Sequence, residues 1–232
     1  MPFTPGVVPV TLSIMRNDQQ PATAVPTLRL ERLVAFSDAV LAIAITLLVL
    51  GLEVPSVHKI PEQQLPEYLT DSIPSVLAYI TSFFLVGMYW LQHYVIFHYV
   101  LHANRTLVLL NGLFLLSVSF LPFPTGLQAV YRGDRLAVAF FGCAHILCGL
   151  TLLALWLYAT HRRRLVAPEV PGRVVRSMTR RIAVGPALSV LAIAASVFDV
   201  WAGKLLFLAI PACYLSHQLV DAGWQRRADV AE

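Results

Sequence analysis

The segment from Leu33 to Leu52 constrains the fold of this chain more than any other. It holds twenty consecutive residues, of which only Ser37, Asp38 and Thr46 are strongly polar. At 1.5 Å per residue, a helix of this length spans about 30 Å, the thickness of the hydrocarbon core of a bilayer. The segment therefore predicts a transmembrane helix. An aspartate inside such a helix is costly, so Asp38 is expected to have a functional role and a partner in the protein interior.

The rest of the chain has the composition of a protein that crosses the membrane several times. Hydrophobic residues make up 57% of its 232 residues and charged residues 13%, and its mean hydropathy is +0.69. Soluble domains contain about 45–50% and about 25% of these two classes. The composition and the apolar segments together predict an all-α integral membrane bundle of six transmembrane helices. We expect the spans at about residues 30–52, 70–99, 106–126, 135–160, 181–200 and 204–224.

The six spans are expected to form a single domain. Residues 29–225 make up this domain, residues 1–28 a disordered cytoplasmic leader and residues 226–232 a cytoplasmic tail. The leader lacks the positively charged start and the long apolar run of a signal peptide. Pro122 and Pro124 are expected to break the third span near its outer end, because proline disrupts the helical hydrogen-bond ladder.

The positions of the basic residues predict the orientation in the membrane. The net charge of +4 does not indicate a nucleic-acid partner or a soluble substrate, because the basic residues cluster between apolar spans and act there as topology signals. With the N-terminus inside, thirteen of the 17 lysines and arginines fall on the cytoplasmic side. The four on the other side are Lys59, Arg132, Arg135 and Lys204. The positive-inside rule therefore predicts that both termini are cytoplasmic.

The start of the first span carries a specific pattern. Arg32, Phe36, Ser37 and Asp38 form the sequence RxxxFSD, which is followed by AVLAIAIT. This pattern resembles the RxxxFSD signature that opens the first helix of the transmembrane protein 175 family, potassium channels of bacteria, archaea and animal lysosomes. The resemblance is clearest over residues 29–55 and weaker through YWLQH at 89–93 and FLPF at 120–123. One six-helix unit, where animal members carry two, implies a prokaryotic member in the plasma membrane.

The resemblance implies a passive, potassium-permeable channel. It also implies that four identical subunits assemble as a homotetramer embedded in membrane lipid, with their first helices lining the pore. Side chains at Ile43, Leu47 and Leu50 then form apolar constrictions that gate the pore by excluding water, in place of a carbonyl-lined filter. Thr46 could offer an oxygen ligand to a permeating cation, or its hydroxyl could bond back to the carbonyl of Ala42. No cofactor and no resident metal are expected, only K⁺ in transit.

Helical geometry separates this pore line from the polar residues of the signature. At 100° per residue, Leu47 and Leu50 lie within about 40° of Ile43 around the helix axis. Ser37 and Asp38 lie about 120° and 140° away, on opposite sides. The polar pair and the apolar line therefore cannot face the same narrow passage. The apolar line itself is not identified by periodicity, because the helix is apolar nearly all round.

In the family, the signature residues form a network that anchors the pore helix to its neighbours. By this resemblance, the network in this chain consists of Arg32, Phe36, Ser37, Asp38, Trp90 and His93. Asn104, Arg105 and Asn111, around the third span, are further candidate partners. Asp38 is therefore interpreted as a structural anchor of the channel, with direct contact to the permeating ion as the alternative. Arg32 either joins the network or extends to the membrane interface.

Other functional classes remain as alternatives. A secondary transporter would need broken helices and internal repeats, and no clear repeat occurs. A proton-leak protein of the membrane is a related alternative. His93 and His145 could ligate a haem. His98 and His102 could bind a metal ion, but an interfacial or proton-sensing role at the inner end of the channel is favoured. An enzymatic activity is not expected, because Asp38 is the only carboxylate near the middle of a span and has no second catalytic partner.

Overall fold

The computed structural model of the chain describes residues 30–52 and 61–211, and these ranges are almost entirely helical. The all-α prediction is confirmed. The helices are α1 (Leu30–Leu47), η1 (Leu48–Gly51), η2 (Glu62–Gln64), α2 (Leu65–Tyr99), α3 (Arg105–Ser119), α4 (Pro122–Val130), α5 (Arg135–Thr160), η3 (His161–Arg163) and α6 (Gly172–Phe198). A further apolar helix covers Val200–Pro211. The expected leader, the C-terminal tail and the last part of the expected sixth span lie outside the described residues.

Five helical segments in the described residues are long and apolar enough to cross a membrane. They are Leu30–Gly51, Leu65–Tyr99, Arg105–Val130, Arg135–Arg163 and Gly172–Phe198. The third of these consists of α3 and α4, and it is interrupted where Pro122 takes the first position of α4. Proline is tolerated there, because the first N–H groups of a helix have no partner inside the helix.

Two helices begin earlier than the apolar pattern indicates. α2 begins at Leu65, five residues before the expected start at 70, with a proline in its first turn. α6 begins at Gly172, nine residues before the expected start at 181. Its first turns carry arginines, which favour helix. The apolar run marks where a helix enters the membrane, and a polar helical extension beyond that point leaves no hydrophobic signal.

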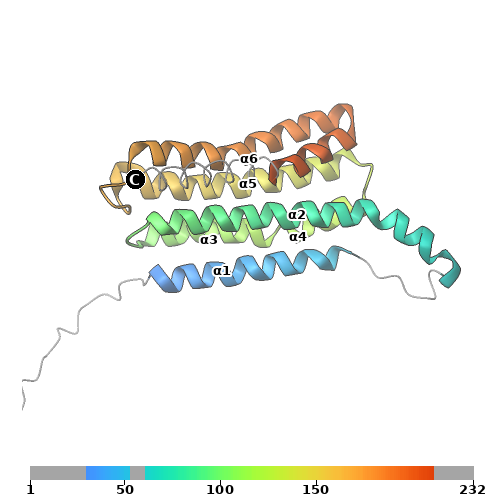
Figure 1. Cartoon of the computed structure of the whole chain (residues 1–232), viewed down its shortest axis with the longest axis horizontal. Helices are drawn as coiled ribbons and strands as arrows, with labels where there is room; N and C mark the ends of the chain where they lie inside the picture. The colour runs from blue at the N-terminus through green and yellow to red at the C-terminus, as the bar shows by residue number, and fades with distance from the viewer. Residues whose placement is uncertain (1–29, 53–60, 212–232) are drawn as a thin grey trace, which may run out of the picture.

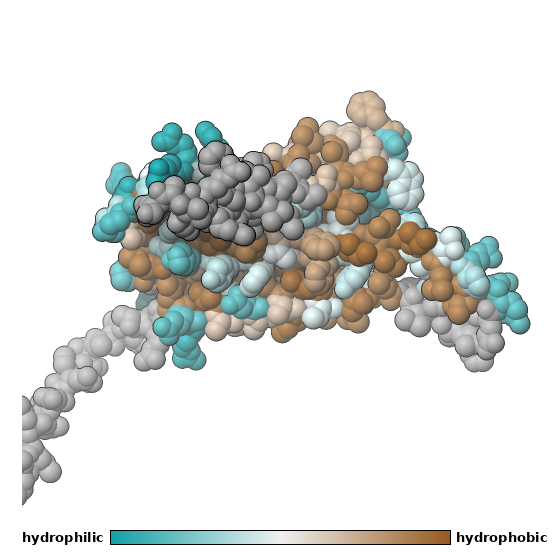
Figure 2. Space-filling model, in the orientation of Figure 1, coloured by the Kyte–Doolittle hydropathy of each residue, from teal (hydrophilic) through white to brown (hydrophobic). Residues whose placement is uncertain are grey.

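α1 lies along one edge of the bundle, α5 and α6 lie along the opposite edge, and α2, α3 and α4 lie between them (Figure 1). Polar residues gather mainly at the two ends of the molecule, with hydrophobic surface between them (Figure 2). At one end the turn between α2 and α3 joins the loop between α5 and α6, where the N–H of Leu101 donates to the carbonyl of Leu165 at 2.8 Å. This surface pattern is the one expected of a multi-pass membrane protein.

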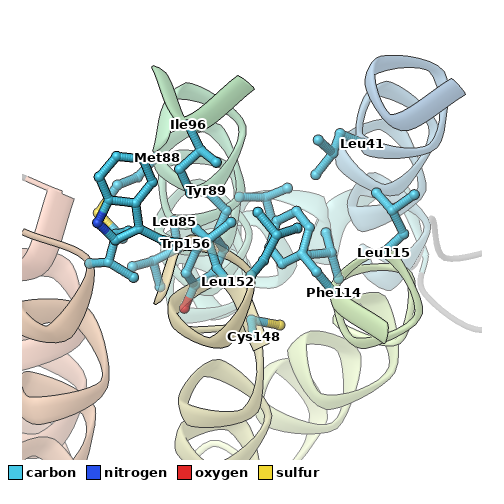
Figure 3. Close-up of a cluster of buried hydrophobic side chains, with 14 of the residues drawn as sticks. Leu41, Leu85, Met88, Tyr89, Ile96, Phe114, Leu115, Cys148, Leu152 and Trp156 are labelled. Carbon is cyan, nitrogen blue, oxygen red and sulfur yellow. The ribbon is translucent and has the colours of Figure 1, made fainter. Parts of the chain in front are cut away.

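The interior of the bundle is filled by large apolar and aromatic side chains. Leu85, Tyr89, Phe114, Leu152 and Trp156 are each 2% exposed or less and come from α2, α3 and α5 (Figure 3). Lipid tails are as apolar as these side chains, so close van der Waals packing replaces the hydrophobic effect as the force that holds the helices together. The centre of the helical bundle is therefore closely packed with side chains.

Glycines let α5 and α6 approach closely. A methyl group added at Gly149 would collide with Cγ of Pro186 on α6 and lie 2.7 Å from its Cδ. A methyl group at Gly142 would lie 2.6 Å from Cγ1 of Ile193. Small residues at such positions are typical of helix contacts in membranes.

We expect Gly149→Ala to lower the melting temperature of the purified protein by about 2–8 °C. Overpacking costs about 1–3 kcal/mol, partly offset by the helix propensity of alanine, and each kcal/mol shifts the melting temperature of a protein this size by about 2–4 °C. Gly87→Ala is the matched control, because a methyl group there meets nothing within 4 Å. Thermal unfolding of both variants in one detergent provides the measurement. Equal melting temperatures would contradict the close contact.

Candidate functional site

The two sides of α1 have opposite environments. One side is packed against the bundle through Ser37, Leu41, Ala44 and Leu48, which are at most 2% exposed. The other side is uncovered: Phe36 is 62% exposed, Ile43 58%, Leu47 40% and Leu50 73%. The three residues predicted to form constrictions therefore lie together on the uncovered side. They are separated from the buried Ser37, as the helical geometry predicts.

η1, which continues α1, is held by a close contact with α4. A methyl group added at Gly51 would lie 3.4 Å from the Cα of Gly126. Beside this contact an open groove of about 480 Å³ is lined by residues that include Leu47, Leu50 and Phe123. The exposed apolar line of α1 thus continues into an apolar groove on the surface of the same subunit.

Thr46 lies on the exposed side of α1, and its hydroxyl donates to the carbonyl of Ile43 at 2.8 Å. The alternative acceptor expected from the sequence was the carbonyl of Ala42, and in the structure the acceptor is the next carbonyl along the chain, that of Ile43. This bond uses the hydroxyl hydrogen and leaves oxygen lone pairs available. A possible role of Thr46 as a cation ligand is compatible with this geometry and stays a prediction.

A buried chain of three polar side chains joins α1, α3 and α2. Nδ2 of Asn111 donates to Oγ of Ser37 at 2.8 Å, and Oδ1 of Asn111 lies 2.9 Å from Nε2 of His93. All three residues are at most 1% exposed. Asn111 occupies the centre of α3, within the apolar run LVLLNGLFLL. The three residues, named here the Ser37–Asn111–His93 chain, cross-link three helices inside the membrane-spanning region.

The hydrogen bonds of the Ser37–Asn111–His93 chain determine which atom of each pair is the donor. The single hydroxyl hydrogen of Ser37 goes to the carbonyl of Leu33 at 2.8 Å, so Ser37 accepts from Asn111. The amide oxygen of Asn111 must then accept, so Nε2 of His93 carries a hydrogen. Within the described residues, Nδ1 of His93 has no hydrogen-bond partner. The imidazole ring itself packs between Phe97 and Phe114, at centroid distances of 4.5 and 5.5 Å.

A second bond joins α1 to α2 nearer the surface. Nε1 of Trp90 donates to Oδ1 of Asp38 at 3.0 Å, and the indole is 42% exposed. Ser37, Asp38, Trp90 and His93 thus lie in two neighbouring contacts. Arg32 and Phe36 are exposed, and among residues 30–52 and 61–211 no hydrogen bond, ion pair or ring contact joins them to this cluster. The geometry groups four of the six residues assigned to the network, together with Asn111.

Residues 32–122 match the family model described as endosomal/lysosomal potassium channel TMEM175. A potassium channel of Chamaesiphon minutus is 36% identical over 188 residues, covering 79% of this chain and 89% of the relative. The chain belongs to the TMEM175 family. The crystal structure of the TMEM175 homolog from Chamaesiphon minutus has a TM-score of 0.72 at 31% identity and covers 81% of this chain and 97% of that chain.

A human TMEM175, named an endosomal/lysosomal proton channel, is 34% identical, and the match covers 82% of this chain and 41% of the human protein. The region matched by the TMEM175 family model runs from residue 32 to residue 122 and so contains α2, α3 and all of α1 except its first two residues. Every residue of the Ser37–Asn111–His93 chain and of the Asp38–Trp90 contact falls inside it. The region that the family model recognises therefore contains the polar contacts that join α1 to α2 and α3.

The remaining polar candidates have separate local roles. Oδ1 of Asn104 accepts from the N–H of Leu107 and caps α3. The hydroxyl of Tyr89 donates to the carbonyl of His145 at 2.9 Å and lies 3.3 Å from its Nδ1. His145 also packs on Phe141 with a centroid distance of 4.4 Å. No group of three His, Cys, Asp or Glu residues suited to a metal ion occurs in the part of the chain that the structure describes.

We expect Asp38→Ala to reduce the yield of folded assembly and to leave the preference for K⁺ over Na⁺ unchanged. The substitution leaves the indole N–H of Trp90 without its charged acceptor, a bond worth about 1.5–3 kcal/mol. Asp38→Asn is the control, because it keeps an oxygen acceptor at the same place. Yield by size-exclusion chromatography and reversal potentials in a planar bilayer provide the measurements. Normal yield with altered ion preference would contradict the anchoring role.

Proposed function

We propose that the chain is one subunit of a potassium-permeable cation channel, a homotetramer in the plasma membrane whose pore is lined by the exposed side of α1. The observation that carries this proposal is the uncovered apolar line of Ile43, Leu47 and Leu50, opposite a side fixed to the bundle by buried polar bonds. A long line of exposed apolar residues on a rigidly anchored helix is suited to meeting copies of itself. One such helix cannot enclose a pore alone.

The packing of the subunit favours a conduction path between subunits. Phe114, Trp156 and their neighbours fill the centre of the bundle (Figure 3). From Ile43 to Leu50 the line extends about 10 Å along the helix axis. In a tetramer, each of these side chains would form a ring of four around the pore. A narrow pore with such apolar rings would exclude water and ions, and a wider one would conduct. We therefore assign Ile43, Leu47 and Leu50 to a hydrophobic gate.

The relatives favour the same class of activity. The Chamaesiphon minutus relative is named a potassium channel, and the human relative is named a proton channel. Passive movement of cations is common to both names. Potassium permeation is the primary proposal for this chain, and proton leak is the second candidate because of the human relative. No bound cofactor is part of either mechanism.

Flux from liposomes tests the proposal. Protein reconstituted into vesicles loaded with K⁺ should dissipate the gradient without any coupling ion, at a rate that rises with the gradient and does not saturate. Empty vesicles are the control. A flux that requires a second ion or saturates would indicate a secondary transporter, and a proton flux without K⁺ flux would favour the second candidate. The mass of the detergent-solubilised assembly should correspond to four copies, and a monomer would contradict the pore arrangement.

A further inference from the structure

A cavity of about 290 Å³ opens at the end of the bundle where α5 leads into α6. Arg163 and Arg176 line it, and Val166, Val170 and Val175 supply an apolar part of its wall. The hydroxyl hydrogens of the two lining threonines, Thr160 and Thr179, are used on backbone carbonyls of their own helices. The guanidinium groups are therefore the charged donors that the cavity offers to a ligand.

The surroundings of the cavity are strongly positive. The segment 161–181 contains seven arginines and one acidic residue, Glu169. Nη1 of Arg163 donates to the carbonyl oxygens of Pro168 and Val170, which are neutral acceptors and leave the charge of the guanidinium uncompensated. Within residues 30–52 and 61–211, no carboxylate pairs with Arg163 or Arg176. Two guanidinium groups that have no carboxylate partner among these residues lie beside one cavity and favour an anion.

The fold holds the first of these arginines in place. Arg162 and Arg163 both have left-handed backbone conformations, with φ of 51° and 53°, and turn the chain out of α5. The loop that follows is anchored, because Val166 and Val170 are 4% and 6% exposed and Val166 forms a bridge to Val100. Arg163 therefore belongs to a packed loop, and its position over the cavity is fixed before any ligand arrives.

The place of the cavity in the fold puts it at the level where lipid headgroups are expected. It sits at the end of two helices long enough to cross the membrane, α5 and α6, where polar residues replace the hydrophobic surface (Figure 2). We propose that it binds the phosphate of an anionic phospholipid, with Arg163 and Arg176 on the phosphate and Val170 and Val175 beside the apolar part of the lipid. Guanidinium groups match phosphate oxygens in geometry as well as in charge. The apolar wall favours a lipid over free phosphate.

Thermal stabilisation of the purified full chain in detergent tests this site without using conduction as the readout. The probes are a short-chain phosphatidylglycerol, the matching phosphatidylcholine and inorganic phosphate. We expect phosphatidylglycerol to raise the melting temperature in a saturable way and phosphatidylcholine to have little effect. Arg176→Gln should weaken the apparent affinity for phosphatidylglycerol by about fivefold, the effect of one basic residue near an anionic lipid surface.

Arg105→Gln is the matched control, because Arg105 is exposed at the start of α3, at the same end of the bundle, and does not line the cavity. Arg176 is the better test position, because Arg163 also holds the loop carbonyls. The melting temperature without lipid shows that each variant is folded. If inorganic phosphate raises the melting temperature and Arg176→Gln weakens this effect, the site is supported, with a soluble phosphate as its ligand. The proposal would be overturned if phosphatidylcholine raised the melting temperature as much as phosphatidylglycerol does. It would also be overturned if Arg176→Gln and Arg105→Gln weakened the apparent affinity for phosphatidylglycerol equally.

Discussion

The Ile43→Asn substitution is expected to raise the basal potassium permeability of the reconstituted channel by about tenfold or more. Ile43 is 58% exposed in the isolated subunit and begins the apolar line of α1. In the proposed tetramer the substitution replaces four branched apolar side chains in one ring with amides that hydrogen-bond to water. Each aliphatic side chain contributes about 1.5–3 kcal/mol to excluding water, and about 1.4 kcal/mol in a barrier changes a rate tenfold.

Two controls separate wetting of the gate from general damage. Ile43→Leu keeps an apolar ring of similar size and should keep the low basal flux. Val49→Asn places the same amide on an exposed residue of the same helical segment, outside the predicted constrictions, and should change flux little. The measurement is potassium flux from liposomes at equal protein density. If Ile43→Asn conducts no better than the parent protein, Ile43 does not form an apolar gate.

Asn111→Leu is expected to destabilise the protein by about 2–3 kcal/mol and to lower its melting temperature by about 4–12 °C. Leucine has nearly the shape of asparagine, so the main change is chemical. Nε2–H of His93 loses its acceptor while it remains buried, and Ser37 loses the donor that ties α1 to α3. Leaving a buried donor without an acceptor lowers the free energy of unfolding by more than the net contribution of the hydrogen bond that is lost.

The double variant His93→Phe with Asn111→Leu is the decisive control. It removes the stranded donor and keeps an aromatic ring to pack against Phe97 and Phe114. Its loss of stability should therefore be smaller than the sum of the two single losses by about 1 kcal/mol or more, the coupling found between residues in direct contact. Thermal unfolding of the four proteins in one detergent gives the cycle. Additive losses would show that the Ser37–Asn111–His93 chain does not act as a unit.

Some properties of the site were predictable from sequence because they depend on residue spacing alone. The RxxxFSD pattern identified the family, and the comparisons confirm it. Helical geometry separated Ser37 from Ile43, and the structure places the first at 0% and the second at 58% exposure. Partners for the polar pair were expected on the second and third spans, and Trp90, His93 and Asn111 occupy those positions.

Other properties depended on contacts that no local pattern encodes. The central place of Asn111 between Ser37 and His93 depends on how three helices meet, although an asparagine in the middle of an apolar run was a usable signal. The pocket lined by Arg163 and Arg176 needed the loop after α5 to fold back onto the bundle. The early start of α6 was missed because its first turns are polar and give no apolar period.

The sequence by itself determined that this chain crosses the membrane several times, that it is helical and that it belongs to the TMEM175 family. Those properties follow from the length of apolar runs, from the bilayer thickness and from one specific motif. Only the tertiary structure decided which side of α1 is buried and which is left uncovered. The physical reason is that lipid and protein interior are equally apolar, so a helix that is hydrophobic all round has no amphipathic face to identify its partner.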